Sequence, residues 1–191
     1  ILFTGKLPEG LAGVQHLYIR YTNRTYAYAA FLREEYPPFT FDTTALDPRD
    51  YAAARTAFEP QYEDRNRLTV AFRIILAIPH AIVLCFLWIA AAFVTIIAFF
   101  SILFTGRYPR PLFNFTVGVL RWSWRVSFYS YGALATDKYP PFSLRSEDYP
   151  ADLEVEYKED MIRWTPLVKW LFAVPHYACL AALSGWGWWH S

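Results

Sequence analysis

The sequence predicts a mainly α-helical, multi-span membrane protein with internal repeats of about 100 residues, interfacial amphipathic helices and short extramembrane strands. Three observations lead to this fold class. A charge-free apolar run extends from Ile74 to Gly106, aromatic residues make up 20% of the chain, and several motifs occur twice. A run of roughly 18 or more apolar residues is typical of a transmembrane helix.

The repeated motifs divide the chain into parts of three units. Three motifs recur in the same order: ILFTG at 1–5 and 102–106, EYPPFTF at 35–41 with KYPPFSL at 138–144, and FRIILAIPH at 72–80 with VKWLFAVPH at 168–176. We therefore assign 1–41 to the end of a first repeat, 42–144 to a nearly complete second repeat and 145–191 to the start of a third. Together they are expected to form one integrated membrane domain, which is part of a longer protein.

The apolar run is too long for a single upright span. At ~1.5 Å per residue it reaches about 50 Å, whereas the hydrocarbon core of a bilayer measures ~30 Å. A break is expected at Pro79, because proline removes a backbone donor and disfavours helix at the residue before it. Residues 65–78 are then predicted to form an amphipathic interfacial helix, and residues 80–104 the first span.

A second helix is predicted over 112–134, after a turn in GRYPRP at 106–111. It carries a polar stripe with Arg121 and Arg125 near its middle, so it either lies flat at the interface or spans with the stripe turned toward protein. Two crossings per repeat would keep all repeats in the same orientation, which favours the span.

The segments between the apolar helices are polar and extended. The sequence ADLEVEYKED at 151–160 alternates apolar and charged residues, a pattern that predicts a β-strand. Its counterpart at 47–60 is richer in alanine, so it is read as a strand that can include a helical turn. A small extramembrane layer of short strands is expected.

Four arginines are the strongest candidate site residues. Arg20 and Arg24 in one unit match Arg121 and Arg125 in the next, and the i, i+4 spacing puts each pair on one helix face. They are candidates for binding lipid phosphates, another anion or carboxylates of a partner subunit. The alternatives are snorkelling of the side chains to the headgroups and pairing with the acidic connections of the same chain.

His80 and His176 occupy equivalent places, each directly after a proline in an apolar run. A neutral imidazole in a membrane can ligate a metal or a tetrapyrrole, or it can cap a helix and form an interfacial hydrogen bond. Each unit offers a single such histidine without cysteine or carboxylate at ligand spacing. No metal site and no cofactor are therefore predicted, with a tetrapyrrole as the alternative.

The remaining features point away from catalysis. No nucleophile elbow, phosphate loop, zinc motif or dinucleotide fingerprint occurs, and the net charge of +1 gives no reason to expect nucleic acid. The leading hypothesis is a non-catalytic accessory or structural subunit that packs against membrane lipids and other integral membrane proteins. The alternatives are a transporter or lipid-handling protein that uses the arginine pair, and a cofactor-bearing protein that uses the histidines.

Several motifs resemble one known family. In order, LAIPH, FLWIAA, ILFTGRYPR, VGVLRWSWRV and LVKWLFAVPHY closely resemble bacterial membrane proteins of the domain-of-unknown-function 4389 family, over most of 66–178. The resemblance implies a multi-pass protein of the bacterial cytoplasmic membrane with internal repeats, and it implies no activity. A diverged copy at 1–41 keeps both arginines but lacks the two tryptophans, so the role of Trp122 and Trp124 is not expected in every unit.

Overall fold

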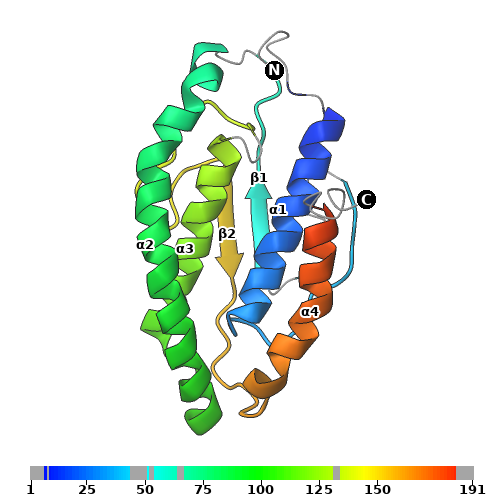
Figure 1. The fold of residues 1–191 in the computed structure, drawn as a ribbon, viewed down its shortest axis with the longest axis vertical. Coiled ribbons are helices and arrows are strands. Elements are labelled where there is room, and N and C mark those ends of the chain that lie inside the picture. Colours follow the sequence, from blue (N-terminus) through cyan, green and yellow to red (C-terminus); the bar gives the residue numbers. More distant parts are fainter. Residues whose placement is uncertain are drawn as a thin grey trace.

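The computed structural model describes residues 7, 9–43, 51, 54–63, 67–130 and 134–183. The fold is mainly helical, and a two-stranded sheet completes it (Figure 1). The elements in chain order are α1 (Glu9–Ala29), β1 (Ala54–Phe58), α2 (Arg67–Thr105), α3 (Arg110–Tyr129), β2 (Ala151–Val155) and α4 (Thr165–Leu183). The first copy of ILFTG lies outside the described residues.

The two strands form the sheet around which the core is built. β1 and β2 pair antiparallel, with Thr56 opposite Leu153. Phe58 turns inward from β1 and its ring lies 4.3 Å from that of His16 on α1 and 6.1 Å from that of Trp124 on α3. The strand predicted within 151–160 is therefore present as β2, and the segment 47–60 contains β1.

The helices flank this sheet on both sides. Across Figure 1 the elements follow the order α2, α3, β2, β1, α1 and α4. α3 contacts both α2 and β2, and α1 contacts both α4 and β1. α3 covers most of the predicted helix 112–134, of which 131–133 lie outside the described residues, and most of its side chains are buried in the fold.

The predicted break at Pro79 is wrong. α2 continues from Arg67 to Thr105 with Pro79 inside it, and α4 likewise contains Pro175. The φ angle of proline is itself helical, so within a long helix the residue removes one backbone hydrogen bond without ending the helix. Such prolines are tolerated in apolar membrane helices. The described part of the predicted interfacial helix 65–78 is therefore the beginning of α2.

α2 touches the rest of the fold along one narrow stripe. The buried residues of this stripe follow one another at intervals of three, four or seven: Val70, Arg73, His80, Leu84, Ala91, Ala98 and Ile102. Large apolar side chains cover the other faces, among them Phe86, Phe93 and Phe104, which are all more than 60% exposed. A water-soluble protein rarely leaves such a continuous apolar surface uncovered.

Two of the described helices are long and apolar enough to cross a membrane: Ile75–Thr105 within α2, and Thr165–Leu183. In the first helix, only 17% of the most apolar 18-residue segment is buried inside the fold. In the second helix, the corresponding share is 28%. The core helix of a soluble protein would be mostly buried, so these two exposed helices favour association with a membrane.

Candidate functional site

The arginines of α3 bind a carboxylate of the neighbouring strand. Arg121 Nε lies 2.8 Å from Asp152 Oδ1, and an Nη of Arg125 lies 3.2 Å from the same oxygen. Arg125 is fully buried and also donates to the carbonyl of Ser143 at 3.4 Å. Arg121 donates to the carbonyls of Leu153 and Leu144. The two arginines thus join α3 to β2 and to the connection before it.

The arginines of α1 also point into the fold. Arg20 and Arg24 are each 1% exposed. Arg20 donates to the carbonyl of Asp42 at 2.8 Å, and the guanidinium carbon of Arg24 lies 5.5 Å from the centre of the Tyr51 ring. The structure therefore places both arginine pairs against connections of the same chain. Their role in binding lipid, anion or partner stays a prediction.

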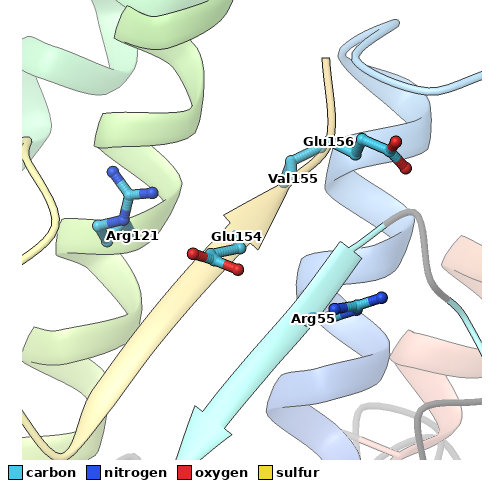
Figure 2. Close-up of a pocket in the computed structure, with 5 residues that line it drawn as sticks. All are labelled: Arg55, Arg121, Glu154, Val155 and Glu156. Carbon is cyan, nitrogen blue, oxygen red and sulfur yellow. The ribbon is translucent and has the colours of Figure 1, made fainter. Parts of the chain in front are cut away.

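One open groove brings charged residues together beside the sheet. The groove has a volume of about 490 Å³ (Figure 2). It is lined by Arg55 on β1, Glu154 and Val155 on β2, Glu156 directly after β2, and Arg121 on α3. Arg55 faces Glu154 across the two strands. Because two glutamates balance the two arginines, the groove does not concentrate positive charge for an anion.

His80 is enclosed by aromatic side chains. Its ring is fully buried, stacks on Phe142 at a centroid distance of 3.9 Å, and lies 4.9 Å from the ring of Tyr139. Trp122 Nε1 donates a hydrogen bond to His80 Nδ1 at 3.1 Å. Helix α2, helix α3 and the connection after α3 therefore all contribute to this enclosure.

The same arrangement recurs around His176 on α4. The buried His176 ring stacks on Phe39 at 4.4 Å and lies 4.6 Å from the ring of Tyr36. The hydroxyl of Tyr21 on α1 lies 2.6 Å from His176 Nδ1. Each histidine thus has one stacked phenylalanine, one tilted tyrosine and one hydrogen-bond partner on the neighbouring helix.

Tyr21 takes the place of Trp122 in the second enclosure. The expectation that the role of Trp122 and Trp124 is not shared by every unit stays a prediction, although Tyr21 contacts His176 Nδ1 as Trp122 contacts His80 Nδ1. A tyrosine hydroxyl and an indole N–H both combine an apolar ring with one donor, so either residue can fill the position. Burial raises the pKa of Tyr21, so its hydroxyl stays protonated.

A buried basic residue stands seven positions before each histidine. Arg73 donates to the carbonyl of Tyr129, forms an ion pair with Asp137, and lies over the Tyr129 ring at 4.8 Å. Lys169 on α4 donates to the carbonyl of Arg33 at 2.7 Å. In both cases a basic side chain of an apolar helix binds a backbone carbonyl near the C-terminal end of a neighbouring helix, because Tyr129 ends α3 and Arg33 follows α1.

The surroundings of His80 do not fit a metal or a tetrapyrrole. Indole is a donor only, so His80 Nδ1 must accept, and Nε2 then carries the proton of the neutral ring. A protonated Nε2 has no lone pair for a metal. The described residues contain no group of three or more His, Cys, Asp or Glu side chains that could hold a metal ion.

Sequence reasoning missed Asp152 and the aromatic partners of the histidines. Asp152 belongs to an acidic segment for which the sequence predicts only a strand, and the packing of β2 against α3 brings it to Arg125. The aromatic partners are the tyrosines and phenylalanines of the two YPPF motifs, 36–39 and 139–142. The recurrence of YPPF together with Pro-His was the available signal.

Glu34 gives a pH-dependent contact at the start of α4. Its carboxylate, with a side chain 10% exposed, accepts hydrogen bonds from Lys158 Nζ at 2.8 Å and from the backbone N–H of Ile162 at 2.5 Å. Burial alone would raise the pKa of Glu34, but these hydrogen bonds and the charge of Lys158 outweigh burial and lower it.

We expect Glu34→Gln to lower the thermal midpoint at neutral pH and to have no effect in acid. A carboxyl group with a lowered pKa stabilises the fold above its unfolded pKa of about 4.3, and this stability is lost as the pH falls through the folded pKa. Melting curves of both proteins from pH 7 to pH 3 check this. Midpoints that differ by the same amount over the whole range would contradict it.

Part of the chain matches a known protein family. Residues 67–143, which contain α2, α3 and the connection that reaches Phe142, match the family model Domain of unknown function (DUF4389). Comparisons with curated proteins and with solved structures give no significant match. The motifs LAIPH, ILFTGRYPR and VGVLRWSWRV all lie within the matched residues. Residues 67–143 are therefore similar to the DUF4389 family, as the sequence motifs indicate.

Proposed function

We propose that the chain is a non-catalytic integral membrane protein that serves as an accessory or structural subunit among other membrane proteins. The observation that carries this proposal is the exposure of α2, whose most apolar window is only 17% buried. An uncovered apolar face of this length needs lipid or apolar partner helices around it. A location in the bacterial cytoplasmic membrane with more than one crossing follows from the family resemblance and from the second exposed helix, α4.

The proposed placement puts α2 and α4 in contact with lipid. The segment Ile75–Thr105 reaches about 46 Å at 1.5 Å per residue, against a hydrocarbon core of ~30 Å. α2 must therefore tilt strongly or extend into the headgroup layer. α3 is best placed on the protein-facing side of α2, because its arginines already have their carboxylate and carbonyl partners inside the fold.

The proposal includes internal repetition of one structural unit. Support comes from the matching surroundings of His80 and His176, which use equivalent residues at two places in the sequence. A carrier that depends on free arginine pairs has less support, since Asp152 lies within 3.2 Å of both arginines of α3.

Washing native membranes with alkaline carbonate tests the placement. The protein should stay in the membrane pellet, whereas Phe93→Arg should move a large part of it to the supernatant or to aggregates. Phe93 lies within the apolar segment and is 64% exposed, and a charge near the centre of a span costs at least about 2.5 kcal/mol. The matched control is Phe72→Arg, because Phe72 is 56% exposed but precedes Ile75.

Release of the unmodified protein by carbonate would overturn the membrane placement. The accessory role has a separate test, which is purification from native membranes in a mild detergent. A stoichiometric membrane-protein partner should accompany the chain, and a chain that always purifies alone would contradict this role.

A further inference from the structure

Two adjoining open pockets of different character, here called chambers, lie between the helices. The larger, about 330 Å³, is lined by small and apolar side chains of all four helices, including Ala30, Ala92, Ile96 and Val119. The smaller, about 240 Å³, is lined on α1 and α3 by polar side chains, including Thr22, Asn23, Ser123 and Ser127. Tyr26, Trp88 and Leu120 line both chambers, so these two spaces adjoin.

The larger chamber opens on the apolar surface of the fold. Ile96 on α2 and Tyr177 on α4 line it and are 54% and 43% exposed. An apolar molecule on that surface therefore has a route into the chamber between α2 and α4. Pockets for small molecules typically measure about 300–1,000 Å³ and are mostly apolar with a few polar groups, which matches the two chambers together.

The smaller chamber presents hydrogen-bond donors for which the described residues supply no acceptor. Asn23 is 6% exposed, and its Nδ2 has no hydrogen-bond partner among the described residues. Trp88 Nε1 donates to Ser123 Oγ at 3.0 Å, so the hydroxyl hydrogen of Ser123 is available for another acceptor. A buried donor without a partner is unfavourable by about 1–3 kcal/mol, and an acceptor on a ligand would remove this penalty.

The lining also excludes one class of ligand. None of the residues that line either chamber carries an Asp, Glu, Lys or Arg side chain. A charged headgroup would lose its water there without gaining a counter-charge, which is strongly unfavourable. The polar end of the ligand must therefore be uncharged and must accept hydrogen bonds.

We propose that the two chambers bind one uncharged lipid, with its apolar part between α2 and α4 and a carbonyl oxygen at Asn23 and Ser123. Both quinones and acylglycerols carry such a carbonyl, and the test distinguishes them. This site goes beyond the proposed function. It uses that function only for the supply of lipid at the opening, so binding in detergent tests the site independently of membrane placement.

The test is titration of the full chain in detergent with decylubiquinone in one arm and monoolein in the other, with native mass spectrometry giving the stoichiometry. One of the two should bind saturably at one molecule per chain, and oleate, with its charged carboxylate, should not compete with it. Ala92→Phe fills the larger chamber and should weaken binding at least tenfold. Ala81→Phe is the matched control on the same helix, at an exposed position outside both chambers.

Asn23→Leu tests the polar end of the site. Loss of one hydrogen bond to the carbonyl should weaken binding about tenfold, and Ser123→Ala gives a second measurement at a partly exposed residue. Melting curves establish that each variant is folded before it is titrated. Absence of saturable binding in both arms, equal binding of oleate, or unchanged affinity in Ala92→Phe and in both polar variants would overturn the proposal.

Discussion

Asp152→Ala is expected to lower the free energy of unfolding by about 3–5 kcal/mol, because it leaves buried positive charge without a carboxylate. Arg125 is fully buried and Arg121 has a side chain only 14% exposed, and both bind the same oxygen of Asp152. A loss of this size is a large fraction of the stability of a typical domain. Denaturant titration of the purified protein in detergent micelles measures it.

Two further variants show that the loss comes from the buried charge. Asp148→Ala removes a fully exposed carboxylate 3.9 Å from Lys138 Nζ and should leave the midpoint of unfolding unchanged. Arg125→Met in the Asp152→Ala background should recover part of the loss, because it replaces the unpaired charge by an apolar chain. An Asp152→Ala protein as stable as the parent would show that the arginines do not depend on this carboxylate.

Gly13→Ala is the second substitution with a large expected effect. A Cβ at Gly13 would lie 2.1 Å from the carbonyl oxygen of Thr43, so either α1 or the backbone after Asp42 must move. Such overpacking typically lowers stability by about 1–3 kcal/mol. The same denaturant titration measures it.

Gly10→Ala is the matched control for this substitution. It makes the same chemical change in the same helix, and a Cβ at Gly10 would meet no atom within 4 Å. Alanine also has the higher helix propensity, so this variant should be as stable as the parent or slightly more stable. Equal stability of the two variants would mean that α1 does not approach Thr43 this closely.

The apolar helices could be predicted because their signal is local. The run from Ile74 to Gly106 lacks charge and is longer than a typical buried helix, and both properties are read directly from neighbouring residues. The effect of Pro79 could not be predicted in the same way. A proline favours a break by its own chemistry, but whether the helix continues depends on the contacts of the turns on both sides.

The partners of the arginines and histidines depend on long-range packing. Sequence reasoning found Arg125 and His80 by their recurrence, but it offered no means to choose Asp152 among the acidic residues of 147–160. Asp152 reaches Arg125 because β2 packs against α3, with Leu153 fully buried and the neighbouring carboxylate bound to Arg125. The equivalence of Trp122 and Tyr21 could not be predicted either, because the two residue types differ. They share only an aromatic ring with one hydrogen-bond donor.

The hydrogen bond between Tyr21 and His176 has a consequence for the order of folding. Its two residues are separated by 155 positions, whereas those of the bond between Trp122 and His80 are separated by 42. Contacts between near residues form sooner, because they close shorter loops. We therefore expect α2 and α3 to associate during synthesis before α1 and α4 do.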